Sequence, residues 1–477
     1  MEKPSRVLTG LMLALCGLLL TLGLLAGTVL YLQHPAFLAA LLAAACLAGL
    51  LFFLRRRELL RPLLRLGEGR CALILCLLCL AVNGLWLLFV HLEPEGDYSV
   101  FWLTSRLLSR GERPTGELNL YLSLFPHLLG YSGFLAPFLR LFGESTAVPA
   151  ALNLALTGLS CLLLFRLCRD RWGLEIAARA ALLWCFLPSK LLYNGMVLSE
   201  PLYTCLLLLF LRLIQLAERR RSLPLTLLLG ALSGLVLRCM NMARPIAAVP
   251  VIAAGIWILL LRGERLREKR DWLRWGGFFA LLLAVYLLLA APARSYLTGI
   301  LGTEPAETPG YNIYVGFNPE TDGGYSEADM VTFGDVLHGP AEDDVNEAQR
   351  QMLALAMERV KTVNLPRLLL GKLRIFLGRD ESAAYHSAQA LSPTVKKLCI
   401  LACNVGYYLL GLLSLAGLWR LWKTREHSTA LLVPLYCVGL TLAQMLAEVS
   451  DRYHYSLLPM LVLLAAVSGR TMKGERT

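Results

Sequence analysis

Apolar residues occur in repeated runs of about 20 along this chain, and polar residues gather in the segments between the runs. A helix of that length matches the roughly 30 Å hydrocarbon core of a bilayer. The pattern therefore predicts an all-α polytopic integral membrane protein with about twelve transmembrane helices. We expect these helices near residues 7–32, 35–54, 71–91, 146–167, 174–193, 200–217, 224–241, 244–261, 275–297, 397–419, 430–447 and 454–469.

Two larger segments, 92–145 and 298–396, interrupt the series, and both are expected to contain interfacial helices on the outer face. In the first segment, the pattern predicts a short helix from Tyr98 to Ser109. Residues 120–142 are apolar, but prolines and glycines interrupt them. We therefore interpret this stretch as an interfacial or re-entrant element and not as a full span.

The second segment consists of three stretches with different residue patterns. Residues 298–346 are rich in glycine and proline and are expected to be loop-like, whereas 347–362 has a helical pattern. In 364–378, leucine, isoleucine and phenylalanine are mixed with arginine and lysine, which is typical of a helix lying in the membrane plane. The chain thus divides into an N-terminal hairpin with a basic loop (1–70), a transmembrane module with the first outer loop (71–297), the second outer loop (298–396), and C-terminal helices with a tail (397–477).

The composition agrees with a membrane protein, since 57% of residues are hydrophobic, 17% are charged and the mean hydropathy is +0.59. The net charge of +12 could indicate a nucleic-acid partner, but lysine and arginine gather in short loops and in the tail. Short basic loops stay in the cytoplasm, and all of them fall on one side if the chain starts inside. We therefore expect no nucleic acid, membrane lipids as partners, and the two larger segments outside. The short loops and the lack of eukaryotic insertions suggest a bacterial plasma membrane.

None of the 13 cysteines lies in the two outer segments. Because they occur within apolar runs, we interpret them as small buried hydrophobic residues. The sequence contains no Cys/His zinc spacing, Walker loop, dinucleotide fingerprint or nucleophile elbow. No cofactor and no metal are therefore expected, although the carboxylates of the outer loops would be compatible with a divalent metal.

Ionisable residues in or near membrane helices are costly, so they suggest function by default. Here they gather at the predicted outer ends of the helices: Asp97, Lys190, Glu200, Arg238, Arg244, Glu448, Asp451, Arg452 and His454. Carboxylates can act as a general base or bind sugar hydroxyls, and arginine or lysine can hold a phosphate. A cluster at one depth suits an enzyme acting at the outer interface better than a transporter, whose polar groups lie near the midplane.

Each of these residues also has a structural alternative. The alternatives are an N-cap role for Asp97, a helix start at Glu200-Pro201, a helix-end position reaching the headgroups for Arg244, an ion pair of Arg452 with Glu448, and a structural role for His454. The functional interpretation rests on their shared depth and not on any one residue.

Short motifs at these positions carry a family resemblance. They are Gly96-Asp97-Tyr98, Phe125-Pro126-His127-Leu128-Leu129-Gly130, Ser199-Glu200-Pro201-Leu202-Tyr203, Arg244-Pro245, Tyr311-Asn312, Gly316-Phe317-Asn318-Pro319-Glu320, Gly324-Tyr325 with Glu327, and Arg452-Tyr453 with Pro459. They resemble the C superfamily of membrane glycosyltransferases, which use polyprenyl-phosphate sugars. The closest branch is that of protein O-mannosyltransferases and aminoarabinose transferases, and the resemblance covers roughly 71–470.

The resemblance implies an inverting glycosyltransferase that moves a sugar from a polyprenyl-phosphate donor to a glycolipid, a cell-wall polymer or a protein at the outer face. Asp97 would be the general base or would orient the acceptor. Glu200 would bind the sugar or support Asp97. Lys190, Arg244 and Arg452 would contact the donor phosphate, and the remaining substrate-binding residues would be Arg238, Glu448, Tyr453 and His454. The second acidic residue that often accompanies the family's aspartate has no clear counterpart here, and the lack of a large C-terminal soluble domain disfavours a protein acceptor.

Two other functional classes stay open. A lipid-linked sugar flippase or transporter would need polar residues along the midplane of several helices, and the helices near 35–54 and 200–217 have almost none. A glycan polymerase or ligase would share the outer loops and the arginines, so the sequence does not separate it from a transferase.

Overall fold

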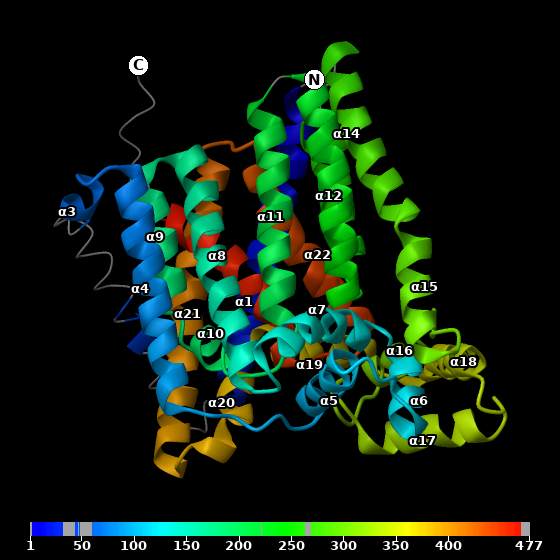
Figure 1. The fold of residues 1–477 in the computed structure, drawn as a ribbon. Helices are drawn as coiled ribbons and strands as arrows, with labels where there is room; N and C mark the ends of the chain where they lie inside the picture. The colour runs from blue at the N-terminus through cyan, green and yellow to red at the C-terminus, as the bar shows by residue number, and fades with distance from the viewer. Residues whose placement is uncertain are drawn as a thin grey trace.

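The computed structural model describes residues 2–31, 43–45, 47, 60–220, 222–262 and 269–468. Every regular element in these ranges is a helix, and they contain no strand. Long helices stand side by side in a bundle, and shorter helices cover one of its ends (Figure 1). The span expected at 35–54 falls almost entirely outside the described residues.

Eight helices in the described ranges are long and apolar enough to cross a membrane, so the chain is a polytopic helical membrane protein. They are α1 (Glu2–Tyr31), α4 (Glu68–Phe89), α8 (Ala147–Trp172), α11 (Glu200–Arg219), α12 (Leu223–Ala243), α14 (Lys269–Leu288) continued by α15 (Ala290–Leu301), α21 (Pro393–Lys423), and α22 (Leu432–Leu446) with its preceding turn η5 (Thr429–Leu431). Each of them coincides with a predicted span.

Three further predicted spans are shorter than expected. Pro188 divides the first of them into α9 (Leu174–Cys185) and α10 (Pro188–Tyr193). The second consists of α13 (Ala248–Ile256) and a π-helical turn, η2 (Trp257–Leu261), and the last consists of a 3-10 turn, η6 (Asp451–Leu457), and α23 (Leu458–Val467). Within the described residues the structure therefore supports eight spans, or up to nine with one bent pair, which is fewer than the twelve expected for the whole chain.

The bent pair lies in the first outer segment, where the helix predicted after Tyr98 is present as α5 (Asp97–Ser109). The apolar stretch that follows forms α6 (Gly116–Leu124) and α7 (His127–Phe142), which meet at 116°. Pro126 lies at the junction, where it disfavours a helical conformation of the residue before it. This stretch is therefore not one straight helix.

The second outer segment is more ordered than expected. Helices α18 (Val345–Thr362) and α19 (Leu365–Leu377) confirm the two predicted ones, and α20 (Ser382–His386) follows with the turn η4 (Ala388–Ala390). The prediction of a loop-like 298–346 was wrong in part, because α16 (Gly310–Gly316) and α17 (Glu327–His338) form there. The Ser326 hydroxyl accepts a hydrogen bond from the Asp329 amide and so caps α17.

The bundle has two different ends. The turns from α8 to α9 and from α11 to α12 lie at the end where α1 begins (Figure 1). Helices α5, α6 and α7 and the series α16–α20 gather at the opposite end, which we call the covered end. The basic turns that follow α8 and α11 and the two outer segments therefore lie at opposite ends of the bundle.

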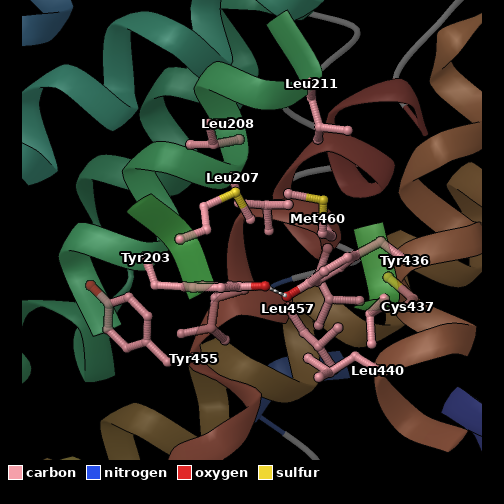
Figure 2. Packing of buried hydrophobic residues seen from close by; sticks show 14 of the residues in the cluster. Tyr203, Leu207, Leu208, Leu211, Tyr436, Cys437, Leu440, Tyr455, Leu457 and Met460 are labelled. Carbon is pink, nitrogen blue, oxygen red and sulfur yellow. Dashed lines mark hydrogen bonds between the residues drawn. The ribbon is translucent and has the colours of Figure 1, made fainter. Parts of the chain in front are cut away.

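A buried core joins α11, α22 and α23 next to the covered end (Figure 2). Tyr203 and Tyr436 are fully buried, and the Tyr436 hydroxyl donates to the Tyr203 hydroxyl over 3.3 Å. The Tyr436 oxygen also lies 2.8 Å from the Ser456 hydroxyl of η6. Because buried polar groups need partners, these bonds fix the start of α11 beside η6.

Helix α12 approaches α14 closely through Gly230 and Gly234, which are four residues apart. A Cβ atom at Gly234 would lie 2.4 Å from the Leu282 carbonyl oxygen, and one at Gly230 would lie 2.5 Å from that of Phe278. Glycines at this spacing let helix backbones pack tightly in membranes.

We predict that Gly234→Ala destabilises the protein by about 1–3 kcal/mol, because the added methyl group overpacks the helix contact. The matched control is Gly299→Ala in α15, where an added Cβ meets no atom within 4 Å. There, alanine should stabilise by up to about 1 kcal/mol through helix propensity. Thermal unfolding in detergent measures both effects, and equal shifts for the two variants would contradict the tight contact.

Candidate active site

Four charged residues of alternating sign form one chain of ion pairs at the covered end. An Arg452 guanidinium nitrogen donates to Asp97 Oδ2 over 2.9 Å. The Nε of Arg452 lies 3.5 Å from Glu200 Oε1, and Arg244 donates to the same oxygen. Asp97 and Arg452 are 355 residues apart in sequence. The fold therefore assembles this cluster, which we call the charge chain, from α5, α11, η6 and the residue after α12.

Both carboxylates stand at the first residue of a helix, yet neither caps it. The N-cap positions of α5 and α11 are Gly96 and Ser199, and no side chain caps either helix. The Asp97 carboxylate turns instead to Arg452. The two helix-start alternatives therefore do not account for where these carboxylates point.

The structural alternatives for Arg244 and Arg452 do not account for their contacts either. Arg244 is 19% exposed and paired with Glu200, so it does not simply extend toward headgroups. Arg452 pairs with Asp97 and Glu200 in place of Glu448, although Glu448 lies close enough to interact with it electrostatically. Both arginines therefore belong to the charge chain.

The two carboxylates differ in environment. The Glu200 side chain is 5% exposed, whereas that of Asp97 is 45% exposed. Partial burial raises the pKa of Asp97, but the Arg452 guanidinium outweighs this effect, and the pKa is lowered overall. Asp97 is therefore an ionised, accessible acceptor at neutral pH, and Glu200 is a buried anchor for the two arginines.

Aromatic rings support the arginines. The Arg452 guanidinium lies 5.3 Å from the centre of the Tyr98 ring and 5.4 Å from that of Tyr453, and Arg244 lies 5.1 Å from the Tyr453 ring. Such stacking orients a guanidinium without consuming its hydrogen bonds. The Nε of Arg452 is buried and makes no hydrogen bond within the described structure. This Nε therefore faces the Glu200 carboxylate at 3.5 Å without a hydrogen bond to it.

The second outer segment is bound to the turn that precedes Arg452. The Glu448 amide donates to the Asn312 carbonyl over 2.7 Å, and the Val449 amide donates to the Gly323 carbonyl over 2.9 Å. Lys372 of α19 donates to the Gly316 and Ala447 carbonyls over 2.7 and 2.6 Å. These bonds place Glu448 at the edge of the charge chain.

Burial raises the pKa of Glu448 to about 7, with Asp97 acting in the same direction and Arg452 and Lys372 acting against it. Burial likewise lowers the pKa of Lys372 to about 7. Glu448 is thus a carboxyl that can both hold and release a proton near neutral pH, unlike Asp97.

Three of the predicted site residues have other partners. Fully buried Lys190 donates to Asn83 Oδ1 over 2.5 Å. Arg238 donates to the Tyr286 carbonyl, which ties α12 to α14. The His454 ring lies 2.8 Å from the Phe376 carbonyl through Nδ1 and 3.3 Å from Asp380 through Nε2. The structure does not place these three in the charge chain, whereas it brings together Asp97, Glu200, Arg244, Arg452, Tyr453 and, at its edge, Glu448.

Sequence reasoning assigned no role to several neighbours. His127 at the start of α7 interacts electrostatically with Arg244 and Asp97. The His386 ring packs edge-on against Tyr98 with centroids 5.0 Å apart. Tyr98 and His127 lie within motifs that resemble the glycosyltransferase family. No motif in the sequence indicates that His386 and Lys372 lie near the site.

An apolar cavity of about 480 Å³ lies between α4 and α8. Its walls include Leu85, Leu88 and Ala151. A smaller hollow shares Leu92 and Gly195 with this cavity and is lined also by Tyr98 and His386. The cavity thus lies beside a hollow whose lining includes Tyr98, the aromatic ring next to Arg452.

A group of at least three His, Cys, Asp or Glu side chains whose ligand atoms lie close together could hold one metal ion. Within the described residues, the only such group is Cys79, Cys161 and Cys185. These cysteines lie in α4, α8 and α9, outside the charge chain. The carboxylates and the histidines around Arg452 do not form such a group.

Comparison with protein families gives no match, and none of the curated proteins matches the chain. Among solved structures, the chain is similar to that of ArnT from Cupriavidus metallidurans bound to undecaprenyl phosphate, with 12% sequence identity and a TM-score of 0.39. The match covers 84% of this chain and 78% of that one. A similarity of this size does not assign the chain to a family.

We predict a pH-dependent effect for Glu448→Gln. The pKa of Glu448 rises from an ordinary 4.5 to about 7 on folding. Between pH 4.5 and 7 the folded protein therefore keeps a proton that the unfolded chain has lost. The free energy of unfolding consequently falls as the pH rises through this range. Glutamine removes this loss. The variant should therefore melt higher than the wild type at pH 8 and at the same temperature near pH 4.5. The same difference at both pH values would refute the raised pKa.

Proposed function

We propose that this chain is an inverting glycosyltransferase that moves a sugar from a polyprenyl-phosphate donor to a hydroxyl acceptor. The observation that carries the proposal is the charge chain, in which an exposed carboxylate and two oriented arginines share one site beside an apolar cavity. The arginines would bind the donor phosphate, and the carboxylate would accept the proton of the acceptor hydroxyl. The cavity would hold the lipid chain.

The cations would act on the donor. Arg452 and Arg244 both face Glu200. Two guanidiniums held by one buried carboxylate can bind a phosphate and stabilise the charge that develops on it as the sugar leaves. The bond between the anomeric carbon and the phosphate oxygen breaks, and the polyprenyl phosphate departs.

The carboxylates would act on the acceptor. In the absence of substrate Arg452 pairs with Asp97 and lowers its pKa, which weakens it as a base. A donor phosphate that binds Arg452 would compete for that pairing and so raise the basicity of Asp97 when the donor is in place. Asp97 could then take the acceptor proton while the acceptor oxygen attacks from the face opposite the phosphate, which inverts the anomeric carbon. Glu448, with a pKa of about 7, is the second candidate for this base.

The cavity between α4 and α8 suits an isoprenoid chain. Its lining is almost wholly aliphatic, and its volume of about 480 Å³ falls within the range of ligand pockets. The shared residues Leu92 and Gly195 would bring the phosphate end of the lipid toward Tyr98 and Arg452.

We place the covered end on the outer face of the plasma membrane. The basic turns that follow α8 and α11 lie at the opposite end, and short basic loops stay in the cytoplasm. The acceptor would then be a glycolipid, a cell-wall polymer or a protein in the outer compartment.

A flippase for the same lipid is the alternative function. Lys190, buried among α4, α8 and α10, is the observation that favours it, because a cation inside the bundle is what a pathway for a phosphate would need. Three buried cysteines beside Lys190 give another reason for its position.

The transfer assay tests the role of Asp97. Asp97→Asn keeps the shape of the side chain but removes its charge and its basicity, so transfer from a radiolabelled polyprenyl-phosphate sugar should fall by at least about 100-fold. The matched control is Asp335→Asn in α17, an exposed carboxylate outside the charge chain, which should keep wild-type transfer.

The folded fraction of each variant is measured by size-exclusion chromatography in detergent. Equal transfer by Asp97→Asn and the wild type would exclude Asp97 as the base and leave Glu448 in its place. If Glu448→Gln also transferred normally, neither carboxylate would serve as the base and the proposed mechanism would fail.

A further inference from the structure

Three cysteine thiols meet inside the helix bundle. They come from three helices: Cys79 from the middle of α4, Cys161 from the middle of α8, and Cys185 from the end of α9. Their sulfur atoms all lie within 4.8 Å of one another. Each residue is at most 1% exposed. Residues as far apart in sequence as 79 and 185 converge here only through the packing of the helices.

A buried cation lies beside these thiols. Lys190 is 0% exposed, and its ammonium group donates to Asn83 Oδ1 and lies 5.1 Å from the Trp184 ring centre. Within the described ranges it has no carboxylate partner. An ammonium group buried without an anion is costly in a protein and more so in a membrane protein. The arrangement therefore calls for negative charge near Lys190.

The thiols can supply that charge. Lys190 lies near enough to all three cysteines for a thiolate at any of them to stabilise its charge, and the Asn83 amide nitrogen lies 3.7 Å from Cys79 Sγ. Thiols become thiolates when a metal binds them, and thiolates are the preferred ligands of soft or borderline metals such as Zn²⁺.

We propose that Cys79, Cys161 and Cys185 supply three of the four ligands of one Zn²⁺ ion, with a water molecule as the fourth ligand and Lys190 as the counter-charge. Binding replaces three S–H bonds by three Zn–S bonds and releases three protons, which leaves a tristhiolate of charge −1. The Lys190 ammonium brings the total to zero, so the bound site has no net charge to bury. A monovalent ion such as Cu⁺ would leave one uncompensated negative charge, which favours the divalent ion.

The metal would fix the wall of the apolar cavity. Leu80 follows Cys79 in α4, and Leu154 lies two turns before Cys161 in α8, and both line that cavity. A bond from zinc to each helix would hold α4, α8 and α9 at one separation. The role is structural and independent of the transfer reaction proposed above.

The experiment measures zinc in the purified full-length protein by plasma mass spectrometry, after growth with added zinc and removal of loosely bound metal. The wild type should hold about one zinc per chain, and Cys161→Ser should hold none. The matched control is Cys168→Ser, two turns further along α8 and equally buried, which should keep the metal.

A variant of the counter-charge distinguishes this site from a packing cluster. Lys190→Met removes the charge but none of the ligands, and it should weaken zinc binding by about 10–100-fold, as changes beside metal ligands do. If Cys161→Ser does not fold, the wild type loaded with Co²⁺ gives the answer, because cobalt thiolates absorb through sulfur-to-metal charge transfer.

The absence of zinc from the wild type, together with the absence of that cobalt absorption, would overturn the proposal. Zinc retained by Cys161→Ser would overturn it as well, and so would a disulfide between two of the three cysteines in the purified protein.

Discussion

The shared carboxylate of Glu200 is the constraint on which the covered end depends. It is nearly buried and faces two guanidiniums, and such charges are stable in a membrane protein only when they are paired. The pairing is possible because the Tyr203, Tyr436 and Ser456 hydroxyls hold α11 beside η6, one turn beyond Glu200 and Arg452. Arg452 then reaches Asp97 of α5. Removing Glu200 would leave both arginines without their common anion and would disturb the site before it disturbed the bundle.

This arrangement explains how one site can hold a charged headgroup and a long lipid. The arginines are oriented before any ligand arrives, because Tyr98 and Tyr453 support their planes and Glu200 their positions. A phosphate would enter as the third anion of a cluster that already contains two. Lys372 and Asn312 tie the second outer segment to the turn that contains Glu448, at the edge of the cluster. In this account, substrate binding replaces the ion pair between Arg452 and Asp97 by one between Arg452 and the donor phosphate.

The sequence predicted what depends on local pattern. Each of the eight long spans, α5, α18 and α19 follows from apolar runs and helical periodicity, and the shared depth of Asp97, Glu200, Arg244 and Arg452 follows from their positions at helix ends. Lateral position does not follow. Arg238 and His454 have the right depth but are bound to Tyr286 and Asp380, since depth along a helix does not tell which face a residue occupies. The cysteines of α4, α8 and α9 looked like separate apolar residues because their convergence depends on packing between helices.

The chemical outcome with the wild-type protein tests the central claim most directly. Purified protein in liposomes would be given a polyprenyl-phosphate sugar and an acceptor, and the product would be followed by nuclear magnetic resonance of the anomeric proton. The account predicts that the sugar–phosphate bond is cleaved and that the sugar appears on the acceptor with inverted configuration. Movement of the intact donor to the other leaflet with no cleavage, for every donor that the protein binds, would contradict it and establish a flippase.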